Sequence, residues 1–573
     1  MPELAPRDPT RRLPASLCAI ALLLALGVYR NALTNPFVYD DHLIVVENPS
    51  ITRLSDLRAI VLHDVKRPLV NLSYAVDYAI WGLAPFGYHA TNLLLHLLNV
   101  GLLFAFARRA AADHDEPSPR AFHNGRELAV AFTAASLAAV HPLMTQAVGY
   151  VAARADLLSG TFVLAVLLCY RSYIVSGRRL WLVAALLLWL LAITAKETVT
   201  MVPPLVALYD WLVLSEHRGG FRRRLLRLHL PVMALMVTIA VVRLVLLLRL
   251  EYGAHDAFYW THLLVEADVL RQYLALLVLP IGQSVFHPVA TIRSATEFRG
   301  LFALLWVVAL VVVAVRVGKR DRLAALGVAW FVLMLVPPAV LVMFDLGEPM
   351  AEHRAYVPSL GAFVFAGSAG GWLWSLARRV RVVWRIALCA VLAAIVTVLG
   401  ALTVQRNAVW SDPVRLWTEA AEGAPDIWVT HLMLGQELQL QGRCDEAVTS
   451  YERAIALRPQ EAFPYLKAGV CLASLGRVQE GARMFERARS LQPRSTRPLI
   501  GLGMMATLEG RHDEARRYFR EAVELDPDDA GAKDALSKAE EHVLAAAAAQ
   551  CASLEGRARE DCVAGVLPGH APR

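Results

Sequence analysis

Charged residues are scarce in this sequence. Asp, Glu, Lys and Arg account for 19% of its 573 residues, whereas hydrophobic residues account for 57% and the mean hydropathy is +0.45. So little charge excludes a single soluble domain, and so long a chain excludes a single membrane anchor. The composition therefore predicts a polytopic membrane protein that carries an additional domain.

Cysteine is also scarce, and the seven cysteines form no metal-binding pattern. The sequence has no Cys-x-x-Cys motif and no group of His and Cys residues of the kind that binds zinc. Cys551 and Cys562 could close a small loop, and Cys444 and Cys471 could pair with each other, but spacing alone does not fix the connectivity. The remaining three, Cys18, Cys169 and Cys389, lie in apolar runs.

Apolar runs long enough to cross a bilayer recur along the first part of the chain and predict about eleven transmembrane helices. The first run follows Arg7, Arg11 and Arg12 but lacks a clear cleavage site, so we expect an uncleaved signal-anchor behind a cytoplasmic N-terminus at residues 1–14. The runs lie at residues 15–33, 91–109, 127–146, 156–175, 180–195, 198–214, 229–249, 301–318, 323–344, 357–376 and 386–404.

Arginine and lysine cluster at alternate ends of these runs, which marks the cytoplasmic side. Segment 263–280 is apolar but contains three charged residues and ends at Pro280, so we expect an interfacial or re-entrant helix there. An odd number of crossings then places the first external loop, residues 34–90, and everything after the last run on the far side. The net charge of +7 predicts contact with anionic membrane lipid and requires no nucleic acid.

Residues 411–548 are more polar and contain a repeat with a period of 34 residues. This period is typical of tetratricopeptide repeats, which stack helix pairs into an α-solenoid with a groove for an extended peptide. We therefore predict an all-α fold, with a transmembrane domain at 15–406, a repeat solenoid at 411–548 and a disordered tail at 549–573. The positions in register are Gly435, Gly469 and Gly503, then Tyr451, Phe485 and Phe519, then Ala454, Ala488 and Ala522, and finally Pro459, Pro493 and Pro527.

Two adjacent carboxylates, Asp40 and Asp41, follow the first apolar run. Carboxylates at a hydrocarbon boundary lose hydration and neighbouring ones repel, so such a pair tends to hold a proton, a cation or a substrate hydroxyl. A solvated turn after the helix is the alternative interpretation, and the pair alone does not decide between the two.

Further ionisable residues gather at membrane boundaries on the same predicted side as Asp40. Each of them could be a helix cap or a snorkelling anchor, and a histidine on an apolar helix, such as His89, is more often a packing residue than a ligand. Together they predict a polar cavity that holds an anion. The residues are His42, Arg67, His89, His141, Arg154, Asp156, Lys196, Glu197, Glu352, His353 and Arg354.

Many of these residues lie in short strings that are followed by the repeats. The strings are Phe37-Val-Tyr-Asp-Asp41, Arg67-Pro-Leu-Val-Asn-Leu-Ser73, Gly87-Tyr-His-Ala-Thr-Asn-Leu-Leu-Leu-His96, Arg154-Ala-Asp-Leu-Leu158, Ala195-Lys-Glu197 and Tyr356-Val-Pro-Ser359. In this order they resemble the TMTC family of membrane protein O-mannosyltransferases, which are of the GT-C class.

The resemblance implies a GT-C-like transmembrane domain in which Asp40 and Asp41 are catalytic. It implies a polyprenyl-phosphate donor that carries mannose or another hexose, and a protein or peptide acceptor that reaches the site through the repeat groove. The chain resembles a bacterial homologue, which implies an inner-membrane protein with its repeats in the periplasm or outside. A eukaryotic homologue would instead lie in the endoplasmic reticulum membrane with lumenal repeats.

The expected reaction is an inverting transfer in which Asp40 or Asp41 acts as the general base. Arg154, Lys196 and Arg354 are the candidates for stabilising the leaving phosphate. A divalent cation held by Asp40 and Asp41 could assist, although two carboxylates alone do not make a specific metal site.

The alternative function is a non-catalytic, membrane-anchored repeat scaffold that assembles an envelope complex. A transporter is disfavoured, because the sequence shows polar clusters at one boundary rather than broken helices near mid-membrane.

Overall fold

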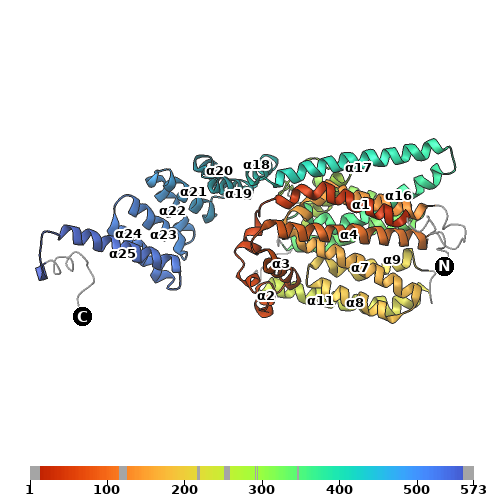
Figure 1. Ribbon diagram of the computed structural model, residues 1–573, viewed down its shortest axis with the longest axis horizontal. Helices are drawn as coiled ribbons and strands as arrows, with labels where there is room; N and C mark the ends of the chain where they lie inside the picture. Colours follow the sequence, from red (N-terminus) through yellow and green to blue (C-terminus); the bar gives the residue numbers. More distant parts are fainter. Residues whose placement is uncertain are drawn as a thin grey trace, which may run out of the picture. The chain divides into compact units, whose positions relative to one another are not determined.

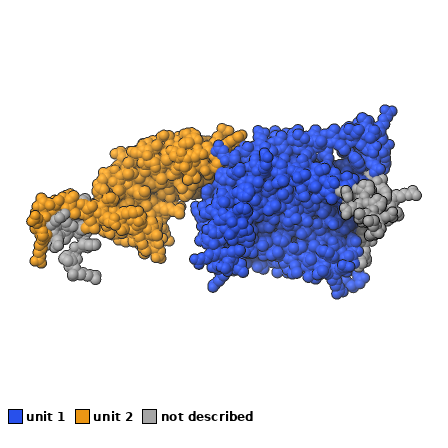
Figure 2. Space-filling model, viewed as in Figure 1, with its two compact units in different colours: residues 1–412 blue, residues 413–573 orange. Residues whose placement is uncertain are grey.

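The structure is a computed structural model that describes residues 13–114, 125–215, 220–250, 259–290, 292, 294–344 and 348–558. All regular structure in these ranges is helical, and none of it is a strand. The chain divides into two compact units, Met1–Asp412 and Pro413–Arg573 (Figure 1; Figure 2). The all-α fold class is thereby confirmed. The predictions for residues 1–12 and for Cys562 lie outside the described ranges.

The first unit is a bundle of long apolar helices joined by short helical turns. In Figure 1 the helices α1, α4 and α7 lie side by side. The helices of this unit are α1 (Leu13–Tyr29), η2 (Arg30–Thr34), η3 (His42–Val46), η4 (Pro49–Thr52), α2 (Leu57–His63), α3 (Pro68–Trp81), α4 (Pro85–His114), α5 (Arg126–Val140), η6 (Pro142–Met144), α6 (Thr145–Gly149), η7 (Val151–Ala153), α7 (Arg154–Ser176), α8 (Arg179–Ile193), η8 (Glu197–Met201), α9 (Val202–Leu212), α10 (Phe221–Arg224), η9 (Leu225–His229), α11 (Leu230–Leu250), α12 (His262–Val278), α13 (Phe298–Gly318), α14 (Arg322–Met334), α15 (Val336–Met343), η10 (Glu352–Ala355), α16 (Tyr356–Ala377) and α17 (Val382–Trp410).

Every one of the eleven apolar runs is helical, but fewer are long enough to span a bilayer alone. Eight helices in the described ranges meet that criterion, or nine if a pair bent by 58° is counted as one span. The bent pair joins α5 to the turn that starts at Pro142, because proline removes a backbone hydrogen-bond donor there. The two remaining runs form α8, which has 15 residues, and the pair η8 and α9. The chain is an integral membrane protein, and its span count is close to the prediction.

Small residues allow α5 and α16 to approach closely at the centre of the bundle. A Cβ atom added at Gly367 would lie 2.5 Å from the carbonyl oxygen of Val130 and 3.1 Å from the side chain of Ala134. Transmembrane helices associate through such close backbone packing, because lipid supplies no hydrophobic driving force between them. This packing fixes the ends of α5 and α16, from which several candidate site residues extend.

Helix α12 lies along one end of this bundle, as expected for an interfacial helix. The His262 ring at its beginning contacts the carbonyl oxygen of Val342 at the end of α15. Tyr273 donates to the carbonyl oxygen of Ala351, just before α16, and His141, just after α5, contacts the carbonyl oxygen of Leu277. Both ends of α12 therefore meet helix ends at the same end of the bundle, so the helix does not traverse it.

The second unit consists of helix pairs, as the repeat period predicts. Each of α20, α22 and α24 ends two residues before one of the repeating prolines, which cannot continue a helix. Helix α25 extends into the segment expected to be disordered, whose residues 559–573 lie outside the described ranges. The helices are α18 (Pro413–Gly423), α19 (Trp428–Leu440), α20 (Cys444–Leu457), α21 (Ala462–Ser474), α22 (Val478–Leu491), α23 (Thr496–Leu508), α24 (His512–Leu525) and α25 (Ala530–Gln550).

The repeating aromatic residues pack on the repeating glycines. A Cβ atom at Gly469 would lie 2.8 Å from the ring of Phe485, and one at Gly435 would lie 2.5 Å from the ring of Tyr451. Any side chain at these positions would push the paired helices apart. The recurring spacing of glycine and aromatic residues in the sequence therefore has a direct packing cause.

Candidate functional site

The two adjacent aspartates occupy different environments. Asp41 is fully buried, and its two carboxyl oxygens accept hydrogen bonds from the backbone N–H groups of Val38, at 3.1 Å, and Ala152, at 2.8 Å. Burial raises the pKa of Asp41 to about 8 even though these backbone bonds lower it. Asp41 therefore ties the first external loop to the beginning of α7. Asp40 is exposed at the surface of the same loop.

Tyr39 and Tyr150 position the backbone of Asp40. Tyr39 has φ of +52° and is the one residue other than glycine in the described ranges with a positive φ. This conformation costs an L-residue roughly 1–2 kcal/mol. The N–H of Asp40 donates to the Tyr150 hydroxyl at 3.2 Å, and the Tyr39 ring stacks on the Tyr150 ring. The strained residue directly precedes the two carboxyl groups, of which Asp41 is buried and Asp40 is exposed.

The protein around Asp40 removes part of its hydration and raises the pKa of its carboxyl group. Tyr150 and Arg67 act in the opposite direction and lower that pKa. Asp40 can therefore take up a proton at a higher pH than an ordinary aspartate, while a cation nearby keeps the carboxylate form available. Both properties suit a general base.

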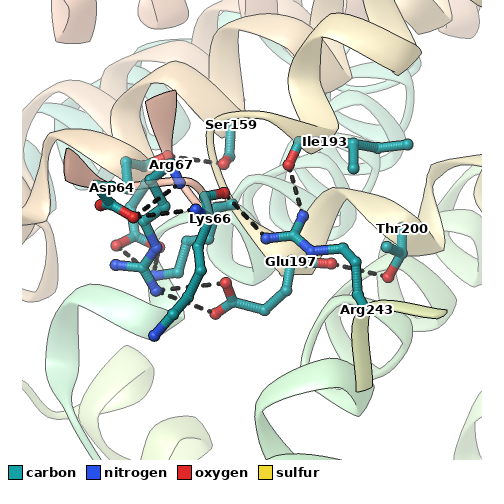
Figure 3. A network of polar contacts seen from close by, with 11 residues as sticks. Asp64, Lys66, Arg67, Ser159, Ile193, Glu197, Thr200 and Arg243 are labelled. Carbon is teal, nitrogen blue, oxygen red and sulfur yellow. Dashed lines mark hydrogen bonds and ion pairs between the residues drawn. The ribbon is translucent and has the colours of Figure 1, made fainter. Parts of the chain in front are cut away.

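Arg67 belongs to a network at the base of the first external loop (Figure 3). Its guanidinium lies 3.3 Å from the nearer carboxylate oxygen of Glu197, and Arg243 of α11 donates to the carbonyl oxygens of Ile193 and Lys66. Burial alone would raise the pKa of Glu197, but Arg67 and Lys196 outweigh it and lower that pKa to about 2. Glu197 therefore stays ionised and holds Arg67 in place.

Lys196 forms a buried ion pair with Asp156. Its Nζ atom lies 2.7 Å from each carboxylate oxygen of Asp156, and the two side chains are 5% and 2% exposed. Burial lowers the pKa of Lys196, while Asp156 and Glu197 raise it. Lys196 thus lies close to Arg67 through their shared neighbour Glu197.

Arg154 is enclosed by other residues and is not accessible from the surface. It is fully buried, its guanidinium lies 2.6 Å from Asp77, and it also donates to Asn92 Oδ1 at 2.8 Å and to the carbonyl oxygen of Tyr88 at 3.0 Å. The guanidinium also lies over the Tyr74 ring. Arg154 holds α3 and α4 against α7, so we do not retain it as a phosphate-binding residue.

Arg354 lies with two carboxyl groups that the sequence analysis did not select as site residues. It donates to the carbonyl oxygen of Glu348 and lies within electrostatic range of Glu266. Burial raises the pKa of each of these glutamates to about 7, and Arg354 lowers it. Glu348 is also close enough to Asp40 for the two charges to interact.

His353 lies between the cations. Arg67, Lys196 and Arg354 are all within electrostatic range of its ring, which also lies 6.4 Å from the Tyr150 ring. Its buried Nδ1 atom has no hydrogen-bond partner among the described residues. We call Asp40, Arg67, Lys196, Glu348, His353 and Arg354 the outer polar cluster. The six residues come from four separate segments of the first unit.

The remaining sequence candidates anchor loops or pack. Glu352 is buried and accepts hydrogen bonds from Gln283, Ser284 and His287, so it anchors the segment after α12. His141 accepts a hydrogen bond from the N–H of Leu143. His89 is buried against the backbone of Asn35, and His42 is half-buried at the beginning of η3.

The described residues include no group of three or more His, Cys, Asp and Glu side chains arranged to hold a metal ion. Both carboxyl oxygens of Asp41 accept backbone hydrogen bonds. A cation bound beside Asp40 and Asp41 would therefore be coordinated by the carboxylate of Asp40. A site with so few protein ligands would depend on oxygens of the substrate.

Two members of the site escaped sequence reasoning, although signals for them existed. Tyr150 lies between the selected residues His141 and Arg154, but only the fold shows that its hydroxyl meets Asp40. Glu348 lies four residues before the selected Glu352, in the same polar stretch. Both residues therefore lie close in the sequence to selected site residues.

Known proteins resemble both units. The family described as tetratricopeptide repeat matches residues 432–482 and 466–530. The solved Arabidopsis OM64 TPR domain aligns with 20% of this chain and 96% of that domain, at 22% identity and a TM-score of 0.20.

Relatives that match most of the chain are named protein O-mannosyl-transferases. Tmtc1 of Drosophila melanogaster is 27% identical over 546 residues, which cover 77% of this chain and 61% of that protein. A relative from Caenorhabditis elegans is 24% identical and covers 77% of this chain and 63% of its own length, and Drosophila Tmtc3 is 24% identical and covers 82% and 58%. The resemblance to TMTC proteins is thus confirmed. The chain spans about three fifths of the length of these relatives.

Proposed function

We propose that this protein is a membrane glycosyltransferase that moves mannose or another hexose from a polyprenyl-phosphate donor to a hydroxyl group on a protein. The names of its relatives support the reaction class. The observation that carries the proposal is the difference between the two aspartates: Asp41 is held by backbone N–H groups, whereas Asp40 is exposed and lies within electrostatic range of Arg67.

Asp40 is the general base in this mechanism. Its carboxylate takes the proton of the acceptor hydroxyl as the hydroxyl oxygen bonds to the anomeric carbon. The bond from that carbon to the phosphate oxygen breaks on the opposite face of the sugar, and its electrons leave with the polyprenyl phosphate. A single displacement of this kind inverts the anomeric configuration.

Arg354 stabilises the leaving phosphate, and Lys196 and Arg67, which are each paired with a carboxylate, add positive charge beside it. Arginine grips phosphate with two N–H groups, and lysine acts as a point charge. Preorganised cations of this kind each lower a barrier by several kcal/mol, on the order of 10²-fold or more in rate. His353, whose Nδ1 atom is unpartnered among the described residues, is placed to bond a donor or acceptor oxygen.

The repeat unit binds the acceptor protein. Tetratricopeptide arrays bind extended segments in their concave groove and have no chemistry of their own. We propose that the array and the outer polar cluster both face the extracytoplasmic side, in the bacterial periplasm or in the lumen of the endoplasmic reticulum.

The test is sugar transfer by the purified full-length protein in lipid vesicles. The donors are polyprenyl phosphates that carry mannose, glucose or galactose, and the acceptors are a panel of envelope or secretory proteins. The proposal expects transfer from one donor class and an inverted anomeric linkage by NMR of the product. If no donor supports transfer while the protein still captures partners through its repeats, the scaffold hypothesis replaces it.

A further inference from the structure

A second buried polar cluster lies at the opposite end of the bundle from Asp40. Asp210 is fully buried and receives two bonds from Arg224, at 2.8 and 2.6 Å, together with one from Tyr170 at 2.8 Å. The His229 ring lies 2.8 Å from the same carboxylate. These residues come from the ends of α7 and α9 and from α10 and η9, which lead into α11, so the cluster fixes these helices to one another at one membrane boundary.

A half-open apolar pocket with a volume of about 40 Å³ begins at this cluster. Tyr170 and His229 line one part of it, and the apolar side chains of α8 and α9, including Ala185, Trp189 and Val202, line the rest. Except for the two residues of the polar cluster, the lining is apolar, which favours a hydrocarbon group.

The pocket opens between α8 and α11. Leu182 and Leu186 on one side and Leu228 and Val232 on the other are partly exposed, and all four line it. Figure 1 shows α8 and α11 along the same side of the first unit. The surrounding segments are apolar enough to lie in a membrane, so the solvent at this opening is lipid.

Exposed arginines flank the opening from both helices. Arg178 and Arg179 lie at the beginning of α8, three to four residues before the lining residue Leu182. Arg222, Arg223 and Arg227 lie on α10 and η9, next to the lining residue Leu228. Basic pockets between transmembrane helices on the cytoplasmic side bind anionic lipid headgroups. An excess of arginine also marks this end as cytoplasmic.

We propose that this pocket binds an anionic phospholipid from the cytoplasmic leaflet. One acyl chain lies along the opening between α8 and α11 with part of its length in the pocket, and the headgroup phosphate contacts the flanking arginines. The lipid fills the opening between these two helices, which Arg243 of α11 joins at their other end through the carbonyl oxygen of Ile193 of α8, so it stabilises the outer part of the bundle. This site is separate from the proposed sugar transfer and does not depend on it.

Photo-crosslinking of the full-length protein tests this proposal. The protein is placed in phosphatidylcholine vesicles that contain trace phosphatidylglycerol or trace phosphatidylcholine with a diazirine in the acyl chain, and the labelled peptides are mapped. The expected result is preferential labelling by phosphatidylglycerol in the stretch from Val166 to Val232. Arg223→Gln/Arg227→Gln should reduce that labelling on the order of fivefold for each arginine removed.

A matched variant separates a specific site from general attraction to anionic lipid. Arg379 and Arg381 are exposed arginines in another basic cluster that has no lining residue of this pocket, so Arg379→Gln/Arg381→Gln should leave the labelling unchanged. Ala185→Leu, which fills the pocket, should reduce labelling by both lipids. Equal loss in the two arginine variants, labelling outside this stretch, or displacement by polyprenyl phosphate but not by phosphatidylglycerol would each overturn the proposal.

Discussion

At the scale of single residues, the candidate site depends on the different roles of two neighbouring aspartates. Sequence reasoning selected both and could not rank them, because the direction of a side chain in a loop is set by tertiary contacts. The backbone N–H groups of Val38 and Ala152 bind the carboxylate of Asp41, whereas Asp40 is exposed. The identity of the pair was predictable, and the roles of its members were not.

Asp41 should matter for stability. Asp41→Ala leaves the buried N–H groups of Val38 and Ala152 without their acceptors, at about 1–3 kcal/mol each. We expect a clear drop in the thermal midpoint of the purified protein in lipid, measured by intrinsic fluorescence. Asp40→Asn, at an exposed position, should leave the midpoint unchanged. A drop of similar size in both variants would contradict the assignment.

The pH dependence of transfer should report on Asp40. A general base must be deprotonated, so kcat/KM falls as the pH drops through the pKa of Asp40, which burial raises above its usual range. Arg67 lowers this pKa, so Arg67→Gln should move the fall in kcat/KM to higher pH. Arg53→Gln removes an exposed arginine from the same loop and serves as the control. An unshifted profile in Arg67→Gln would show that Asp40 is not the titrating group.

At the scale of elements, buried polar contacts connect the helices that carry the site. The sequence located Arg154 correctly at the beginning of a helix, but its partner Asp77 lies in an amphipathic segment far away in the chain. Periodicity predicts which residues share one helix and gives no information on which helices meet. For that reason the sequence suggested Arg154 as a phosphate ligand, whereas the structure shows that it makes structural contacts between helices.

Arg154→Met should therefore weaken the fold itself. It removes the cation from a buried pair and leaves Asp77 uncompensated, at about 3–5 kcal/mol. The expected result is a lower thermal midpoint and faster proteolysis of the first external loop in lipid vesicles. Arg53→Met is the matched control. A stable Arg154→Met variant that loses only donor binding would return Arg154 to the phosphate site.

In the repeat unit, Cys444 and Cys471 are placed to form a disulfide. Both are buried free thiols whose Sγ atoms lie 2.7 Å apart, on α20, the second helix of one pair, and α21, the first helix of the next. Oxidised glutathione should convert the two thiols to a disulfide and be reduced to two glutathione molecules. The link should stabilise the unit by about 3 kcal/mol.

Alkylation followed by mass spectrometry measures this change. Both cysteines should escape alkylation after oxidation and denaturation, and Cys444→Ser should leave Cys471 reactive. Full alkylation of both cysteines after prolonged oxidation would contradict the expected link.

At the scale of the whole molecule, hydropathy and repeat period predicted the architecture well. All eleven apolar runs are helical, because a chain in lipid must satisfy its backbone hydrogen bonds within each segment. Length alone did not distinguish full spans from the short α8, the bent α5 and the pair η8 and α9, since these are shaped by neighbouring helices. The regular spacing of glycine and aromatic residues located the repeats correctly, because this spacing arises from packing within each helix pair.

The measurement that tests the central claim most directly is single-turnover sugar transfer by Asp40→Asn beside the wild type and Glu47→Gln. Glu47 is an exposed carboxylate in the same loop and controls for loss of charge. Loss of a general base should slow transfer on the order of 10²–10⁴-fold with unchanged donor binding and an unchanged thermal midpoint, while Glu47→Gln stays near the wild-type rate. Transfer by a folded Asp40→Asn protein at the wild-type rate would contradict the claim that Asp40 is the base.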